Sequence, residues 1–353
     1  MNNPHELLEP RDVKLLPFYR QRKWLIIAGG VTVCAVILFA IIAYAASATA
    51  DFLGHHGGSD GSVFIFGRYA PTVQKFTVIE SAARLAQPIN VTTVETVMPM
   101  ARFDAAAVEW RGRIYITGGD VTGQASNRVD VYEPATNTWT LAAPMIEARE
   151  EHVAAVLNDS LIVCGCDIIG DVNCLHTCEL LAHPAATVWT RLWTPACSMY
   201  SAAVVHRNRL YIIGSWCLGR AHEMHIYDAD TQLWYQGTPT LAERAGHAAV
   251  LVNDHILVCG GSDGPAEQSS TCERYDFATA QWSYVAPMLQ KRNNLQLVLA
   301  GDSVFAIGGY PGGAGFLDTI EKYNWRNNSW SMLDSTIANA MWKHSAVAVN
   351  NVL

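Results

Sequence analysis

A short apolar segment that ends in glycine recurs six times along the chain, and this repeat restricts the possible folds more than any other feature. The glycines are Gly67, Gly118, Gly165, Gly214, Gly260 and Gly308, with a period of 46 to 51 residues. A repeat of this length is typical of one supersecondary unit that packs against copies of itself. Each unit contains several short apolar strands, so the chain is expected to be all-β, with its units stacked side by side.

Further residues recur at fixed places in the unit. An arginine stands sixteen residues before the glycine in four units: Arg102, Arg149, Arg244 and Arg292. A tyrosine follows in four units: Tyr132, Tyr227, Tyr275 and Tyr323. A tryptophan comes next in five: Trp139, Trp189, Trp234, Trp282 and Trp330. Glycine permits unusual backbone angles, and the two aromatic types bury large areas between twisted sheets.

This combination of arginine, glycine, tyrosine and tryptophan resembles the kelch repeat. The resemblance extends from Ser62 to the C-terminus and implies a six-bladed β-propeller, a fold with which many kelch proteins bind partner peptides. Two units depart from the pattern, because Gly165 is followed by Cys166 and Gly214 by Ser215. Irregular blades are expected there.

The number of strands per unit predicts how the ring closes. Five full units have four strands each, over residues 101–145, 146–193, 194–240, 241–288 and 289–333. The N-terminal piece, 63–100, has only three strands, Val63–Phe66, Lys75–Ile79 and Thr93–Val97. The C-terminal segment 344–349 resembles a first strand, since His344 matches His152 and His247 of full units. We therefore expect the C-terminal strand to complete the N-terminal blade, which would leave no open edge.

The N-terminal region predicts a membrane anchor. Residues 24–50 contain no charged side chain, and about 20 apolar residues suffice to cross a bilayer. The expected organisation is a cytosolic tail (1–23), a transmembrane signal anchor (24–48), a linker (49–62) and the propeller (63–353). Arg20, Arg22 and Lys23 precede the span, which predicts a single-pass protein with a cytosolic N-terminus and a lumenal or extracellular propeller. A cleaved signal peptide is the alternative, because Ala-x-Ala sites occur at 46–48 and 48–50.

Charge and sequons agree with that placement. The chain carries a net charge of −8, of which the tail contributes +2, so the remainder is acidic. An acidic domain argues against nucleic acid as a partner, because phosphate binding needs a basic surface. Three N-x-S/T triplets are candidate glycosylation sites: Asn90, Asn158 and Asn327.

Two interpretations of the recurrent arginines stay open. Arg102, Arg149, Arg244 and Arg292 could line a basic pocket on the face that carries the long loops, where they would bind a carboxylate. Alternatively, each could pair with an acid on the third strand of its unit: Asp130, Glu179, Glu273 or Glu321. Less repetitive residues on the same face are further candidates for ligand contact: Trp216, His222, Tyr310 and Lys343.

The cysteines also allow two interpretations. Cys164 and Cys259 occupy equivalent positions, as do Cys178 and Cys272. Cross-strand disulfides Cys164–Cys178 and Cys259–Cys272 are one possibility in an oxidising compartment, and buried free thiols are the other. A cluster of potential zinc ligands lies between residues 164 and 178, but its spacing matches no compact zinc motif, so we expect no metal.

No sequence motif indicates catalysis. The chain has no phosphate-binding glycine loop, no HExxH helix and no nucleophile elbow, and we expect neither an enzyme nor a cofactor. The expected function is a membrane-anchored recognition or scaffold module that binds an unidentified protein or glycan. The alternative is a carbohydrate-active propeller enzyme similar to the sialic-acid mutarotases, which are compact six-bladed kelch proteins.

Overall fold

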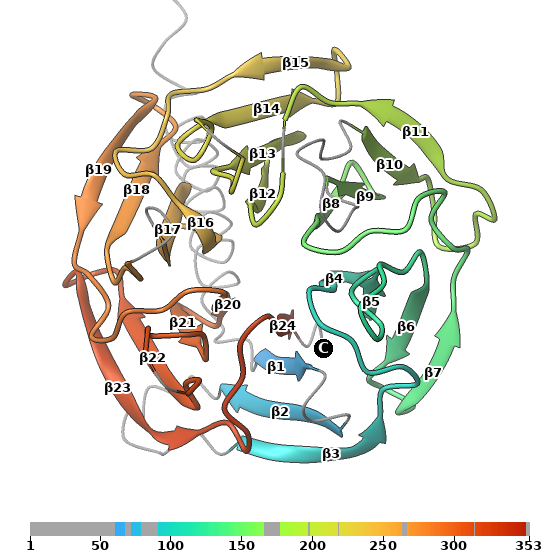
Figure 1. Ribbon diagram of the computed structural model, residues 1–353, viewed down its shortest axis with the longest axis horizontal. Coiled ribbons are helices and arrows are strands. Elements are labelled where there is room, and N and C mark those ends of the chain that lie inside the picture. The colour runs from blue at the N-terminus through green and yellow to red at the C-terminus, as the bar shows by residue number, and fades with distance from the viewer. Residues whose placement is uncertain are drawn as a thin grey trace, which may run out of the picture. The chain divides into compact units, whose positions relative to one another are not determined.

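A computed structural model describes residues 61–67, 72–78, 91–165, 177–196, 198–217, 219–262, 267–313 and 315–350. These residues form six four-stranded antiparallel sheets. The sheets are arranged as blades around a central axis, and one strand of each blade lies innermost (Figure 1). The expected all-β, six-bladed propeller is confirmed.

The blades are numbered here from the N-terminus, with the strands of each given from the axis outwards. Blade 1 is β24 (Ser345–Asn350), β1 (Gly61–Phe66), β2 (Thr72–Val78) and β3 (Val91–Val97). Blade 2 is β4 (Ala106–Trp110), β5 (Arg113–Thr117), β6 (Val129–Glu133) and β7 (Thr138–Leu141). Blade 3 is β8 (Val153–Leu157), β9 (Ser160–Cys164), β10 (Thr177–Leu181) and β11 (Thr190–Trp193).

Blade 4 is β12 (Ala202–His206), β13 (Arg209–Ile213), β14 (Met224–Asp228) and β15 (Leu233–Gln236). Blade 5 is β16 (Ala245–Val252), β17 (His255–Ser262), β18 (Cys272–Asp276) and β19 (Gln281–Val285). Blade 6 is β20 (Gln296–Ala300), β21 (Ser303–Ile307), β22 (Thr319–Asn324) and β23 (Ser329–Thr336).

The predicted tail, membrane span and most of the predicted linker lie outside the described residues. The linker was expected to reach residue 62, whereas β1 already begins at Gly61, so its last two residues belong to the propeller. Within the described ranges, no helix has the length and hydropathy that a bilayer crossing requires.

The recurrent aromatic residues join the two outer strands of a blade and then link that blade to the one before it. Tyr132 lies directly opposite Trp139 across β6 and β7, with ring centroids 4.9 Å apart. The same pair recurs in blades 4, 5 and 6 at 4.9 to 5.1 Å. The indole N–H of Trp189 donates to the carbonyl of Ala143 in blade 2 at 2.9 Å, and Trp330 does the same to Ala286 in blade 5. Blades are therefore held together at their rims as well as through their apolar faces.

The glycine that ends the second strand in blades 2 to 6 is needed because the next blade approaches it closely. Gly118 has φ +57°, and a Cβ atom there would lie 2.2 Å from the carbonyl oxygen of Arg149 and 2.7 Å from the His152 ring. Gly214 is placed in the same way against Arg244 and His247. A larger residue would push the blades apart. Burial of the histidine rings holds the pKa of His152 and of His247 at about 3, so both are neutral.

The C-terminal strand completes blade 1, as predicted. β24 pairs antiparallel with β1, from Gly61 opposite Asn350 to Phe66 opposite Ser345. In Figure 1 this places the red end of the chain beside its blue beginning, within one sheet. β2 and β3 begin three and two residues earlier than expected, at Thr72 and Val91.

A closed ring of backbone hydrogen bonds surrounds the axis. One residue from each blade donates its N–H to the carbonyl of the equivalent residue in the neighbouring blade, at 2.6 to 3.3 Å. In order of donation, the members are Asp104, Lys343, Asn294, Gly246, Tyr200 and Glu151, after which the ring returns to Asp104. All six have φ between 50° and 66°. A left-handed backbone is unfavourable for five of these residue types, so the packing of the blades must impose it.

Removal of residues 341–353 should strongly destabilise the propeller, because it deletes β24 and one member of the axial ring. We expect the melting temperature to fall by at least roughly 10 °C, as a strand loss of several kcal/mol implies for a domain of this size. Circular dichroism or differential scanning fluorimetry of the full chain provides the measurement. The control is removal of residues 351–353 alone, which follow β24; an unchanged melt for the longer deletion would contradict closure.

Candidate functional site on the loop face

The two faces of the propeller differ in the kind of connection they carry. Because neighbouring strands are antiparallel, the connections from second to third strands and from fourth strands to the next blade share one face, the loop face. The opposite turn face carries tight turns such as 158–159 and 325–328. Binding residues are commonly found on the longer, less regular connections, so the loop face is the candidate functional surface.

The four recurrent arginines do not line a pocket on this face. The side chains of Arg102, Arg149, Arg244 and Arg292 are at most 1% exposed. Each is paired with the acid on the third strand of its own blade: Asp130, Glu179, Glu273 or Glu321. The predicted basic ligand pocket is therefore wrong, and the alternative of internal ion pairs describes these residues.

Arg149 illustrates what the buried pair does. Its Nε and Nη2 both donate to Glu179 Oε1, at 3.1 and 2.8 Å, and Nη1 donates to the carbonyls of Gly165 and Thr177. Glu179 also accepts from the backbone N–H groups of Ile146 and Glu147, which connect blade 2 to blade 3. One ion pair therefore fixes the connecting loop, the glycine turn and the third strand, with every charged atom hydrogen-bonded.

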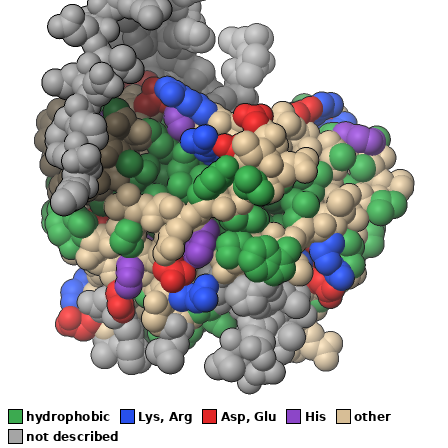
Figure 2. All heavy atoms as spheres, turned by 90° about the horizontal axis from the view of Figure 1, so that it is seen from above, with side chains coloured by type: hydrophobic (Ala, Val, Ile, Leu, Met, Phe, Trp, Pro, Cys, Tyr) green, Lys and Arg blue, Asp and Glu red, His purple; other side chains and the backbone are tan. Residues whose placement is uncertain are grey.

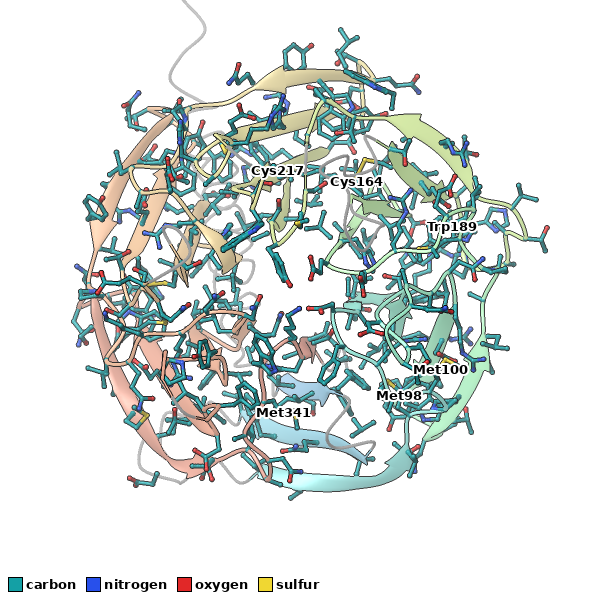
Figure 3. All side chains as sticks on the ribbon, viewed as in Figure 1. Met98, Met100, Cys164, Trp189, Cys217 and Met341 are labelled. Atoms are coloured by element: carbon teal, nitrogen blue, oxygen red, sulfur yellow. A yellow bond between two sulfur atoms is a disulfide. The ribbon has the colours of Figure 1, made fainter. Side chains whose placement is uncertain are left out.

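The two blades that lack the arginine also lack the acid. In blade 1 the arginine position is Met341, and the acid position is Gln74, whose Oε1 accepts from the N–H of Ala338 at 2.7 Å. Met341 is buried beside this blade (Figure 3). In blade 4 the two positions are Ser198 and His225. A buried carboxylate without its cation would be costly, which explains why both change together.

Four side chains of the axial ring, those of Asp104, Glu151, Tyr200 and Lys343, form a polar cluster at the centre of the loop face, which we call the axial cluster. Lys343 donates from Nζ to Asp104 Oδ2 at 2.8 Å, to Glu151 Oε1 at 3.2 Å and to the Tyr200 hydroxyl at 2.5 Å. The charged side chains are only 9 to 17% exposed. Side chains reach from the inner ends of the blades toward the axis in Figure 3.

The axial cluster has fewer positive than negative charges. One ammonium group faces two carboxylates, and Glu150 stands next to Glu151 in the chain. Burial raises the pKa of Asp104 to about 7, with Glu151 and Glu150 adding to the rise and Lys343 opposing it. Asp104 therefore changes protonation close to neutral pH, whereas Lys343, whose pKa is raised by the two carboxylates despite its burial, stays charged.

Aromatic side chains flank the axial cluster. The Lys343 ammonium lies 4.8 Å from the ring centroid of Tyr200 and 5.3 Å from that of Trp342. Trp216, which is 47% exposed, packs edge-on against Tyr200 at 6.4 Å. On the other side, Tyr310 lies 6.0 Å from Trp342, and Phe316 stacks on Trp342 at 5.1 Å. The centre of the loop face thus combines buried charge with accessible aromatic surface.

Three of the predicted contact residues meet here and one does not. Lys343 is the centre of the axial cluster, and Trp216 and Tyr310 border it. His222 instead lies 3.8 Å from Glu243, on the connection from β13 to β14. Sequence reasoning missed Asp104, Glu151, Tyr200 and Trp342. The first three stand at the position two residues after the recurrent arginine or its equivalent, and this position varies from blade to blade.

The remaining predicted sites are placed as follows. Disulfides join Cys164 to Cys178 and Cys259 to Cys272, each across adjacent strands, and Cys217 is also disulfide-bonded. Asn158 and Asn327 are exposed on the turn face, whereas Asn90 lies outside the described residues. Among the residues that the structure describes, no cluster of three or more potential metal ligands occurs.

Comparison with known proteins gives a consistent family assignment. The profile of the attractin/LZTR1 β-propeller matches residues 63–312. Beta-scruin of Limulus polyphemus is 30% identical over 181 residues, which are 47% of this chain and 20% of that protein. The kelch repeat protein M-T8 of myxoma virus is 29% identical, over 49% of this chain and 33% of that protein. Human kelch-like protein 23 is 28% identical, over 46% and 29% respectively.

The chain aligns with one fifth to one third of the length of these relatives. Among solved structures, that of YjhT superposes with a TM-score of 0.66 and 16% identity, covering 78% of this chain and 95% of that one. At this identity the likeness concerns the fold alone.

Replacement of Arg149 by methionine should cost about 3–5 kcal/mol, because Glu179 would remain buried without its cation. The matched variant Arg102→Met should cost less, since Asp130 keeps Arg128, which donates to it at 2.7 to 3.0 Å. The double variant Arg149→Met with Glu179→Gln reproduces the pair found in blade 1 and should be more stable than Arg149→Met alone. Urea denaturation measures all three; equal losses for the two single variants would contradict this account.

Asp104 should make the propeller less stable as the pH rises from about 4 to about 7. In that range the folded protein binds a proton at Asp104 that the unfolded chain has released, since the folded pKa of about 7 exceeds the ordinary value of 3.8. The free energy of unfolding of the wild type, minus that of Asp104→Asn, should therefore fall as the pH rises, by up to about 1.4 kcal/mol per pH unit. Urea denaturation of both proteins at several pH values tests this, and a constant difference would refute it. The buried histidines contribute equally to the pH dependence of both proteins, so their contribution cancels in the difference.

Proposed function

This chain belongs to the attractin/LZTR1 β-propeller family, and we propose that it is a membrane-anchored recognition module that binds a protein partner through its loop face. Kelch-type propellers generally bind protein partners. The proposed partner site is the axial cluster together with its aromatic border.

The observation that carries this proposal is the contrast between repeated and unrepeated residues. The residues that recur from blade to blade are buried or partly buried and hold the fold: arginine, acid, tyrosine, tryptophan and glycine. The axial ring keeps one backbone geometry, yet its six positions carry six different residue types. A scaffold requires no such variety, whereas recognition of one specific partner does.

The membrane anchor is proposed from the sequence of residues 24–48. That segment is long enough to span a bilayer and follows three basic residues at 20–23. An N-terminus in the cytosol would place the propeller in the lumen or outside the cell. Asn158 and Asn327 would then be open to glycosylation on the turn face, away from the proposed partner site.

A second candidate function is a carbohydrate-active enzyme similar to the sialic-acid mutarotases. This function was considered because the four recurrent arginines could have bound a sugar carboxylate. All four are instead buried in ion pairs and do not face a ligand. Its remaining support is Asp104, whose pKa of about 7 suits a general acid or base. We therefore rank it below partner recognition.

The proposal predicts that Trp216→Ala weakens binding of a partner that the wild type captures. The control is Trp325→Ala, which removes an indole of similar exposure, 40% against 47% for Trp216, from the turn face. Quantitative proximity labelling from the native membrane, followed by binding measurements with the purified partner, should show at least a roughly tenfold loss for Trp216→Ala only. Equal binding by both variants would place the partner elsewhere. A mutarotation assay with sialic acid, comparing the wild type and Asp104→Asn, separates the enzyme from the binder.

A further inference from the structure

We propose that a cleft between blades 3 and 4, at the rim of the loop face, binds an uncharged sugar residue. The cleft has a volume of about 440 Å³, within the range of small-molecule sites. Its lining residues are Trp193, Pro195, Arg220, Glu223, His225 and Gln236. None of them belongs to the axial cluster, so this inference does not depend on the proposed partner site.

Three segments build the cleft. Trp193 ends β11 and Pro195 follows it, while Glu223 and His225 stand at the start of β14 and Gln236 ends β15. Arg220 donates from Nη1 to the carbonyl of Pro195 at 3.2 Å, which ties the β13–β14 connection to blade 3. β14 and β15 lie at the top of Figure 1, so Figure 2 views this rim, where hydrophobic, acidic, basic and histidine side chains are mixed.

The charges of the cleft are balanced internally. Arg220 Nη1 lies 3.6 Å from Glu223 Oε2, and His225 Nε2 lies 2.9 Å from the same oxygen. The carboxylate therefore already has cationic and polar partners, and the guanidinium already has an anion. A charged ligand would have to break this network, whereas an uncharged ligand would leave it intact.

Trp193 provides the apolar wall. Its side chain, at the end of an outer strand, is 67% exposed. The indole therefore offers a large, flat apolar face to a ligand. The backbone carbonyl of Trp193 accepts from the indole N–H of Trp234 at 3.0 Å, which fixes the chain from which the exposed ring projects. A sugar presents one face of C–H groups that packs on an aromatic ring.

The polar side chains around the indole supply both donors and acceptors. Arg220 donates, Glu223 accepts, and the amide of Gln236 does both. Hydroxyl groups are donors and acceptors at once, so a polyol matches this combination better than an ammonium, a carboxylate or an alkyl group does. Aromatic stacking together with mixed planar polar groups therefore selects a neutral saccharide.

The test compares uncharged and charged probes on the full chain in nanodiscs. Saturation-transfer difference NMR with the methyl glycosides of glucose, galactose and N-acetylglucosamine should detect binding of at least one of them. Glucuronate and arginine amide should bind more weakly. Trp193→Ala should weaken sugar binding by roughly tenfold, which corresponds to about 1.4 kcal/mol. Trp193→Phe, which keeps an aromatic face, should retain part of the affinity.

Trp325→Ala and Trp216→Ala serve as controls, because each removes an exposed indole outside the cleft. Both should bind sugar as the wild type does, and all variants should keep the wild-type melting temperature. Absence of binding to every glycoside, an equal loss in Trp216→Ala, or a preference for a charged probe would each overturn the proposal.

Discussion

At the axis, every blade receives one backbone hydrogen bond from a neighbour and gives one to the other, and the circle closes only when six blades are present. This constraint fixes six residues in a left-handed backbone that most of them would otherwise avoid. Their Cα positions are set by the ring and not by their side chains. Because the backbone is held in this way, the side chains can differ freely, and Lys343 can meet carboxylates from two other blades.

The buried ion pairs stabilise the interior of four of the six blades. Arg149, Arg244 and Arg292 each donate to a glycine carbonyl and to the third strand, and the acid of each pair accepts from the inter-blade connection. Charge thus holds backbone segments whose carbonyl and N–H groups have left the strands. Arg102 instead donates to the carbonyl of Ile116 within β5. The pair is replaceable as a unit, as Met341 with Gln74 demonstrates. What these blades have in common is therefore the hydrogen bond from the inter-blade connection to a side chain of the third strand, which Glu179 accepts in blade 3 and Gln74 in blade 1.

Much of the fold could be predicted from the sequence because it repeats: the glycines, aromatic pairs and strand count determine six blades and their closure through β24. The axial cluster could not be predicted, because Asp104, Glu151, Tyr200 and Lys343 are far apart in sequence and meet only once the ring has formed. The recurrence of the arginines favoured ion pairs over a pocket, and their burial decided between the two interpretations. The rim cleft could not be predicted for another reason. Its residues come from strand ends and connections of two blades, and their spacing in the sequence follows no motif.

Closure through β24 also determines the order in which the chain can acquire its structure. Blades 2 to 6 contain only consecutive strands, so each can form as its own strands are synthesised, whereas β1, β2 and β3 have no inner partner until Ser345–Asn350 has been synthesised. During translation, β1 presents an unpaired apolar edge to its surroundings. The ring, and with it the axial cluster, can form only after β24 has been synthesised, so a chain terminated before residue 343 would lack Lys343 and the strand that covers that edge.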